Sequence, residues 1–262
     1  METLILQDAR EWAAAIAEMP GRLPLPCRTV VVPNTRVAHG LRRELCRMGK
    51  QDVLAGTLFI GAHALAAEVL WAAGVQFREG EEDLRPLRLR QVFSGKLKLE
   101  YFKPSLLANT PGWDLAFAAV IDDLESAGLV PPDLANAADA QARDVGHIWA
   151  ALDKLPNLAW TQARVFIRAT IELADGARWP LPGPVLAAVT GHESAVEAAF
   201  LCAIPNITIT LRLARPLRDE HLQRIEQLFG IKVPAVCRPP TGKSERDILA
   251  AYLFESAEPR VP

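Results

Sequence analysis

The segment Thr29–Leu45, TVVVPNTRVAHGLRREL, decides the fold of this chain. Its first part, Val30–Val32, is a continuous β-branched run, which is typical of a strand buried on both faces of a parallel sheet. A Pro-Asn turn follows, and Arg36–Met48 has the periodicity of an amphipathic helix. A strand, a tight turn and a helix in this order are the building unit of an α/β sheet, so the segment predicts an α/β fold.

The predicted helix has two chemically different faces. The apolar face carries Val37, Leu41, Leu45 and Met48. The opposite face carries four basic side chains: Arg36, Arg43, Arg47 and Lys50. A helix N-terminus with arginines nearby suits phosphate oxygens, because its free backbone N–H groups and its dipole both favour an anion. We therefore predict that Asn34 in the turn and these four basic residues bind DNA, the alternative being an ordinary solvated helix face.

Further apolar runs extend this unit into a sheet that a helical block interrupts. Strands are predicted at five places: Leu4–Leu6, Val30–Val32, Thr57–Ile60, Val185–Val189 and Ile207–Leu211. Between the third and the fourth, residues 79-179 show helical patterns and almost no strand pattern, and a stretch that long is a subdomain rather than a loop. We expect one parallel sheet domain from residues 1-75 and 183-236, a helical insertion over residues 76-182, and a helix and linker over residues 237-262.

The helical block holds a second basic segment and an acidic one. Leu84–Tyr101 is predicted as one helix, and the segment Leu84–Lys103 is a second candidate region for DNA contact. Its basic side chains are Arg85, Arg88, Arg90, Lys96 and Lys98. The acidic side chains Asp122, Asp123 and Glu125 lie on the helix that begins at Trp113. Paired carboxylates can bind Mg²⁺, but neighbours along a helix point in different directions, so we expect a solvated acidic face.

The composition limits the possible classes of protein. A net charge of −2 over 262 residues means that any DNA contact must come from a local basic face. The four cysteines form no CxxC pair, which argues against a zinc ribbon or a disulfide framework and predicts free thiols: Cys27, Cys46, Cys202 and Cys237. The first residues lack the apolar core of a signal peptide, and no stretch approaches the roughly 20 apolar residues of a membrane span. We expect a cytoplasmic protein without membrane contact.

No complete catalytic motif stands in the sequence. Residues 241-244, TGKS, come nearest to a phosphate-binding loop, but GxxxxGK[ST] needs a glycine where Cys237 stands. His192-Glu193 lacks the second histidine of HExxH, because Val196 occupies that position. His192 follows a predicted strand end, where α/β sheets bind ligands, and its alternative interpretation is a turn residue. We predict no catalytic residue, no metal site and no cofactor.

The order of these segments resembles superfamily 1 DNA helicases. VVVPNTRVAHGLRREL is similar to the helicase segment T-N-x-A-A-x-x-L/M-x-x-R-L, and the matching residues are Asn34, Arg36, Ala38, Leu41 and Leu45. GTLFIGAHALAAEVL is similar to the T-F-H-S segment that follows it, through Thr57, Phe59 and His63. The helical block is similar in position to the helicase insertion named 1B. Residues 184-211, PVLAAVTGHESAVEAAFLCAIPNITITL, are similar to a late segment of AddB-type proteins.

This resemblance implies a fold and a role. AddB-type proteins are partner subunits of bacterial helicase-nuclease complexes. Together with inactivated superfamily 1 helicases, they join a degenerate helicase region to a C-terminal RecB-like nuclease domain. The resemblance thus implies a RecA-like sheet, similar to that of P-loop NTPases, and a role in DNA repair and recombination. The implied partners are DNA, single-stranded or as a duplex end, and a helicase-nuclease subunit.

Departures from the helicase pattern indicate an inactive motor. A helicase carries its phosphate-binding loop after the first strand, where this chain has Gln7-Asp8-Ala9-Arg10, and an Asp-Glu pair after a later strand, where it has Thr190-Gly191-His192. Phosphoryl transfer then lacks its phosphate cradle and its Mg²⁺ carboxylate. The nuclease residues are not visible before Pro262. We expect a catalytically inactive scaffold, the N-terminal part of a longer protein with exonuclease activity.

Two other functions stay open from the sequence. One is a protein-interaction module without DNA contact, which the exposure of the Arg36 face would help to separate from a DNA-binding scaffold. The other is a small-molecule transferase on a Rossmann-like sheet. Such an enzyme needs a glycine-rich loop after the first strand or polar groups that converge at the strand ends.

Overall fold

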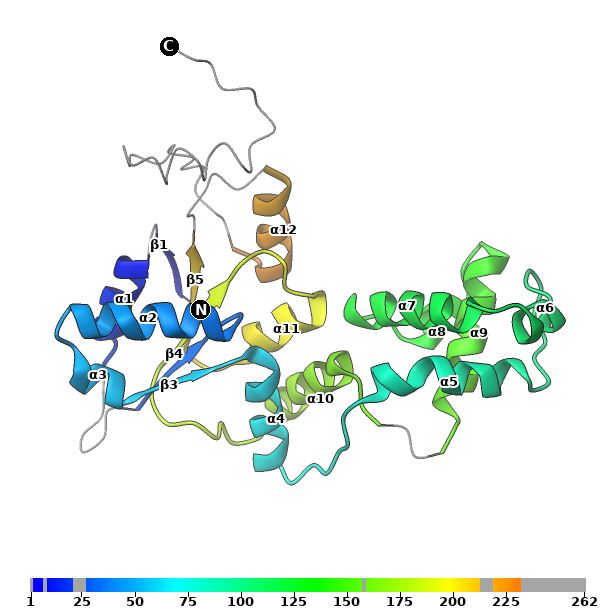
Figure 1. Ribbon diagram of the computed structural model, residues 1–262, viewed down its shortest axis with the longest axis horizontal. Helices are drawn as coiled ribbons and strands as arrows, with labels where there is room; N and C mark the ends of the chain where they lie inside the picture. Colours follow the sequence, from blue (N-terminus) through cyan, green and yellow to red (C-terminus); the bar gives the residue numbers. More distant parts are fainter. Residues whose placement is uncertain (1, 7–8, 21–26, 157–158, 213–218, 232–262) are drawn as a thin grey trace, which may run out of the picture. The chain divides into compact units, whose positions relative to one another are not determined.

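A five-stranded sheet joins the beginning of the chain to residues beyond 180 (Figure 1). Its strands are β1 (Glu2–Leu6), β2 (Arg28–Val31), β3 (Thr57–Ile60), β4 (Val185–Val189) and β5 (Ile207–Arg212). All pairs are parallel, and the spatial order is β1-β5-β4-β2-β3. The predicted α/β fold with a parallel sheet is therefore confirmed.

The computed structural model describes residues 2–6, 9–20, 27–156, 159–212 and 219–231. The TGKS segment, Cys237 and the helix predicted over residues 237-262 lie outside these ranges. The described residues group into two compact units. All described strands belong to the first unit, and most described helices belong to the second.

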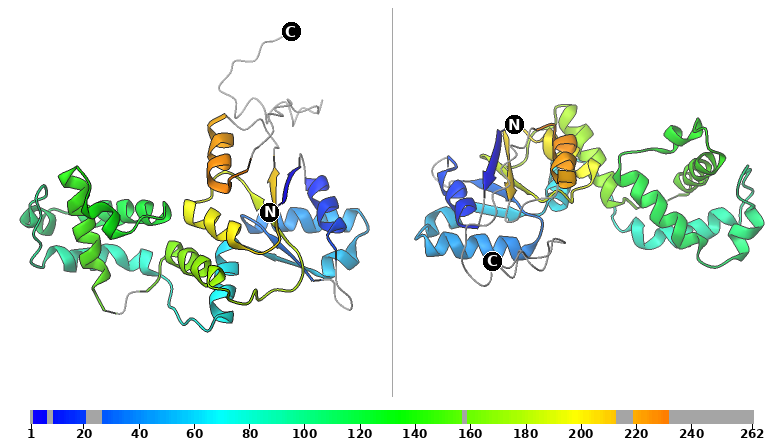
Figure 2. Two further views of the ribbon diagram at one scale, coloured as in Figure 1. Left: turned by 180° about the vertical axis from the view of Figure 1, so that it is seen from behind. Right: turned by 90° about the horizontal axis from the view of Figure 1, so that it is seen from above.

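Alternate side chains along the central strands β2 and β4 point to one face of the sheet and contribute to the core of the first unit. Residues two apart in a strand share a face, so Val30 and Val32 point to the same side as Leu186 and Ala188. Helices α1 (Ala9–Glu18) and α2 (Thr35–Arg47) pack on this side, and the buried side chains that they contribute are Trp12, Ala13, Ile16, Ala38, Leu41 and Leu45. Short α3 (Gln51–Ala55) follows α2, and α12 (Asp219–Phe229) lies on the other side of the sheet (Figure 2). The four described residues of β2 are all buried, as the β-branched run predicts.

Gly183 lets the chain enter β4 beside β2. Its φ is +86°, and a Cβ atom there would lie 1.9 Å from the carbonyl oxygen of Cys27. Any other residue would clash with this backbone through its Cβ atom. The positive φ alone would also strain a residue that has a side chain, even where space is free. The close approach places Thr29 N–H 3.1 Å from the Pro184 carbonyl and pairs Thr29 with Val185.

The regular elements described in the second unit are helices, apart from an isolated β-bridge between Glu79 and Trp160. Its helices are α4 (Ala62–Ala72), α5 (Glu81–Phe93), α6 (Pro104–Asn109), α7 (Trp113–Ser126), α8 (Pro131–Ala135), α9 (Ala140–Asp153), α10 (Gln162–Ala174) and α11 (Ala195–Ala203). Part of its core is a cluster on α5, α7 and α9 that includes Leu89, Phe117, Ile121, Ile148 and Trp149. The helix predicted over Leu84–Tyr101 is wrong in its second half, because α5 ends at Phe93. Leu97 and Leu99 pack against this core instead, and Lys96 and Lys98, which alternate with them, are exposed, which is the alternation of an extended chain.

The compact units differ from the domains predicted by sequence. Helices α4 and α11 group with the helical unit, whereas the predicted boundaries place both with the sheet. The predicted domain division stays a prediction. No described helix is long and apolar enough to cross a membrane.

Candidate functional site

Asn34 sets the start of α2 at the carboxyl end of β2. Its backbone is extended, with φ of −163°, and its side-chain oxygen accepts a hydrogen bond of 3.0 Å from the Val37 N–H. This N-cap satisfies one of the free donors of the first helical turn. The predicted DNA-binding role of Asn34 therefore has to coexist with a structural one, since its oxygen is already engaged.

A small cleft opens beside this turn. It has a volume of about 190 Å³, and its walls come from the ends of β2 and β3 and from the first two turns of α2. The polar or aromatic side chains that line it are Asn34, Thr35, His39, Arg42 and Phe59. The cleft lies at the carboxyl edge of the sheet, the edge at which α/β sheets bind their ligands, beside β2 and β3 and not at the reversal of strand order between β2 and β4. The cleft is smaller than the roughly 300 Å³ at which ligand pockets usually begin, so it fits part of a ligand better than a whole cofactor.

Arg42 is a residue of this cleft that the sequence reasoning missed. Its guanidinium carbon lies 5.0 Å from the centroid of the Phe59 ring, which is a cation–π contact between α2 and the adjacent strand β3. Arg42 and Thr35 are seven residues apart and share one face of the helix, while Arg36 is turned about 100° from Thr35. The available signal was the i, i+3, i+7 spacing of Thr35, Ala38 and Arg42 beside the core face.

The predicted basic face is exposed, but it does not line the cleft. Arg36, Arg43, Arg47 and Lys50 are all exposed, and none of them is a lining residue. Arg36 and Arg43 lie two turns apart on α2, about 10 Å along the axis. Arg47 forms an ion pair of 2.6 Å with Glu44. Lys50 lies beyond α2, at the N-cap position of α3.

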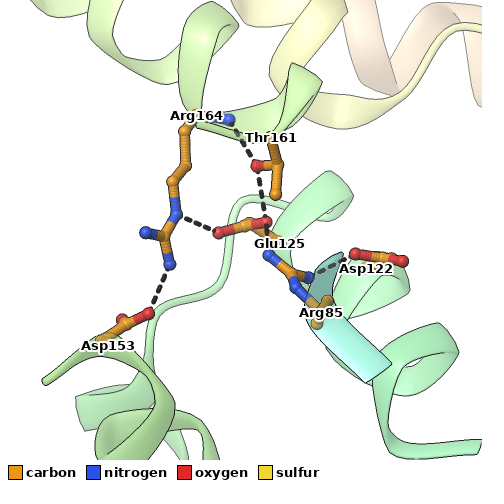
Figure 3. Close-up of polar contacts among 6 residues, drawn as sticks. All are labelled: Arg85, Asp122, Glu125, Asp153, Thr161 and Arg164. Atoms are coloured by element: carbon orange, nitrogen blue, oxygen red, sulfur yellow. Dashed lines mark hydrogen bonds and ion pairs between the residues drawn. The ribbon is translucent and has the colours of Figure 1, made fainter. Parts of the chain in front are cut away.

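Arg85 of the second basic segment has its partners inside the helical unit (Figure 3). Arg85 is 0% exposed and bonds to Asp122 and, at 2.8 Å, to Glu125. Glu125 also accepts from Arg164 Nε at 2.6 Å and from Thr161 Oγ1 at 2.7 Å. Arg164 reaches on to Asp153, so the network links α5, α7, α9 and α10.

This network corrects two expectations. The acidic face was expected to be solvated, but Glu125 is only 3% exposed, while Asp123 is exposed as expected. Burial works against ionisation of Glu125, yet Arg85 and Arg164 outweigh it and hold the pKa of its carboxyl below the ordinary value. Arg85 is not available to DNA because it is enclosed, and the charge of exposed Arg90 is offset by the buried Asp114 at 2.6 Å. Helical periodicity hides such pairs, because it does not tell an exposed face from a face between two helices.

The strand end after β4 carries no complete catalytic set. His192 is exposed, and its backbone N–H lies 3.4 Å from Thr190 Oγ1, as in a turn. Ser194 caps α11 by accepting from the Glu197 N–H at 3.2 Å. Burial and the nearby Glu193 carboxylate raise the pKa of Glu197 to about 7. Within the part of the chain that the structure describes, no three His, Cys, Asp or Glu side chains converge as metal ligands would.

No protein-family model matches this chain, and no curated protein sequence matches it. The function that follows therefore rests on the residues, on the fold and on the resemblance in segment order.

Proposed function

We propose that this chain is a catalytically inactive, helicase-like scaffold of a DNA repair and recombination protein similar to AddB, and that it contributes DNA binding or partner binding. The order of its elements supports this proposal. A strand and helix pair, β2 and α2, is followed by β3 and α4, then by a block of helices, and then by β4, α11 and β5. The resemblance to superfamily 1 helicases implies the same order of elements, and we propose on this basis that the sheet is RecA-like and the helical block a 1B-like insertion.

The proposal that the chain does not hydrolyse ATP rests on the short link between β1 and α1. Strand β1 ends at Leu6 and helix α1 begins at Ala9, so only residues 7 and 8 stand between them. A phosphate-binding loop between a strand and a helix takes about eight residues, and its glycines let the backbone wrap the phosphates. A two-residue link has neither the length nor the glycines for this task.

DNA contact is assigned to the exposed face of α2. Arg36 and Arg43 are exposed on one face of a helix that begins at the carboxyl edge of the sheet. Arg42 and His39 flank this face from the cleft. A transferase is less well supported, because the cleft is smaller than the pockets that usually hold a small-molecule substrate.

Nucleotide binding tests the inactive state. A ligand present at 100 times its Kd stabilises a protein by about 2.7 kcal/mol, which a thermal unfolding curve detects readily. We expect no change in the midpoint of unfolding with millimolar ATP and Mg²⁺, and no phosphate release with DNA present. A clear upward shift with ATP and Mg²⁺ would remove the proposal of an inactive motor.

Salt-dependent binding tests the DNA contact. The double variant Arg36→Ala, Arg43→Ala is compared with Arg47→Ala by fluorescence anisotropy of a labelled oligothymidylate. We expect the double variant to bind more weakly and to lower the slope of log K against log salt by about 1.4, because each phosphate contact on a single strand adds about 0.7. Arg47→Ala should change less, since Glu44 already offsets its charge. If the wild-type chain fails to bind at low salt, the proposed DNA contact is removed.

A further inference from the structure

A short exposed segment of the helical unit combines three lysines with an aromatic ring. We infer that this Lys–Tyr segment, made of Lys96, Lys98, Tyr101 and Lys103, is a second contact for single-stranded nucleic acid. The lysines would bind phosphates, and Tyr101 would stack on a base. The inference deepens the proposed DNA-binding role and rests on it, but its residues are different from those of α2.

The backbone of the segment directs the lysines outward. Leu97 and Leu99 are partly buried and pack against the core of α5, α7 and α9. Lys96 and Lys98 alternate with them and are exposed. In an extended chain, residues two apart point to the same side, so the two lysines share the side opposite the core.

A buried carboxylate fixes the next residues. Asp144 on α9 is 0% exposed and accepts hydrogen bonds from three successive backbone N–H groups, those of Glu100 at 2.9 Å, Tyr101 at 2.8 Å and Phe102 at 2.9 Å. Burial works against ionisation of Asp144, but the three N–H groups outweigh it and hold its pKa below the ordinary value. A segment that is ordered before binding loses less conformational entropy when it binds, which favours affinity.

Tyr101 is exposed and also contacts a neighbouring ring. The residue is 60% exposed, although its ring lies 4.9 Å from that of Phe102 at an angle of 84°. Phe102 rests in turn against Trp113 and Phe117, with ring centroids 5.8 Å and 5.2 Å away. An aromatic ring that is anchored but exposed is what single-strand binding proteins offer to a base, and such a contact tolerates any base.

The charge of the segment favours a polyanion. Glu100 is the one acidic residue between Lys96 and Lys103, and its carboxylate forms an ion pair of 2.5 Å with Arg143. The positive charge of the lysines is therefore not cancelled within the segment. Lys96 and Lys103 are at most about 25 Å apart along a fully extended backbone, so the three ammonium groups can serve consecutive phosphates of one short strand. Basic residues interleaved with an exposed aromatic ring fit single-stranded nucleic acid better than an acidic protein surface, which would leave Tyr101 without a stacking partner.

The experiment measures the binding of the full 262-residue chain to labelled oligothymidylate over a range of salt. The lysine variant Lys96→Ala, Lys98→Ala, Lys103→Ala should bind at least about tenfold more weakly, with a salt slope lower by about 2. Tyr101→Ala should weaken binding about tenfold with an unchanged slope, and Tyr101→Phe should bind like the wild type, because stacking needs the ring and not the hydroxyl. Lys154→Ala is the matched control, an exposed lysine at the end of α9 in the same unit, and should leave binding unchanged. Unfolding curves confirm that each variant folds.

The outcomes separate this inference from the proposed function. In one outcome the Arg36 and Arg43 variant loses affinity, while the lysine variant and Tyr101→Ala stay within twofold of the wild type. This outcome overturns the inference that the Lys–Tyr segment binds nucleic acid, and the proposed function stands. If the segment variants lose affinity and the α2 variant does not, the inference stands and the α2 contact fails. If Tyr101→Ala weakens a blunt duplex as much as the single strand, the assignment to single strands is overturned. A wild-type chain that binds no nucleic acid at low salt overturns both.

Discussion

Helices α2 and α5 are each 13 residues long and carry several arginines, yet they use them in opposite ways. On α2, Arg36 and Arg43 are exposed on the face opposite the core. On α5, Arg85 is enclosed between α5 and α7 and is held by two carboxylates. The difference lies in the neighbours of each helix. The apolar face of α2 packs on the sheet and on α1, whereas α5 meets the acidic face of α7. A basic helix is thus not by itself a binding surface.

The largest expected effect comes from breaking the buried network. Arg85→Met leaves Asp122 and the buried Glu125 without one of their cations, and removing one partner of a buried ion pair usually costs about 3–5 kcal/mol. Urea unfolding should show a loss of that size. Arg36→Met on α2 is the matched control and should change the free energy of unfolding by less than about 0.5 kcal/mol. Equal losses for the two variants would show that the two helices do not differ as described.

A partly buried carboxyl group of the same unit, that of Glu197, gives a pH-dependent effect. The folded-state pKa of Glu197, about 7, lies above its ordinary value of 4.5, so the folded chain holds an extra proton between these values. The stability is then complete below about pH 4.5, falls as the pH rises to about 7, and levels off above it. Glu197→Gln should remove this fall and stabilise the chain by about 2 kcal/mol at pH 8, measured by urea unfolding across this range. An unchanged pH profile in the variant would refute the assignment to Glu197.

The same pH series separates Glu197 from the ion-pair network. The pKa of Glu125 is lowered, so its contribution is present above the ordinary value of 4.5 and is lost as the pH falls through the lower folded-state value. Glu197→Gln should therefore leave the acid side of the profile unchanged. If Glu197→Gln changed the stability profile both above and below about pH 4.5, the two carboxyl groups would not titrate independently.

A smaller effect is expected at the start of α2. Asn34→Ala removes the N-cap bond to Val37 and should destabilise the chain by about 1 kcal/mol. Asn34→Asp keeps the acceptor and should retain the stability, but it adds a negative charge beside the predicted phosphate contacts. Unfolding and oligothymidylate binding, measured on both variants, tell the structural role from the DNA-binding one. Weak DNA binding by Asn34→Ala alone would assign the effect to the lost N-cap bond, because Asn34→Asp lacks the amide N–H groups as well.

The smallest effect on stability should come from the exposed face of α2. Removing both Arg36 and Arg43 is expected to change the free energy of unfolding by less than about 0.5 kcal/mol, because neither side chain packs in the core. Oligothymidylate affinity should fall in the same protein. A large loss of stability would instead assign these arginines to structure, as in α5.

Several parts of the fold follow from local patterns. The strands at Thr57–Ile60 and Val185–Val189 were predicted with their observed bounds, because apolar β-branched runs between turn residues leave few alternatives. Helix α10 begins after its N-cap Thr161, and α11 begins after its N-cap Ser194. In each case the side-chain oxygen accepts a hydrogen bond from a backbone N–H of the first turn that has no partner within the helix. The end of α5 was missed, because basic residues continue past Phe93 and the extended alternation of Leu97 and Leu99 is short.

The candidate residues divide in the same way. Exposure of Arg36 and Arg43 could be predicted, because they lie opposite the apolar stripe of one helix. The contact of Arg42 with Phe59 could not, because it depends on which strand lies beside β2. The fate of Arg85 could not either, because its partners Asp122 and Glu125 follow it by 37 and 40 residues.

The sequence by itself determined the α/β class, the basic face of α2 and the lack of a phosphate-binding loop after the first strand. Each depends on side chains that are neighbours along the chain, where the periodicity and the spacing of a motif are visible directly. Only the tertiary structure decided which charges are exposed and which are enclosed. It paired Arg85 with Glu125 and fixed residues 100-102 on Asp144, because burial and opposite charge act through space between segments that the sequence keeps apart.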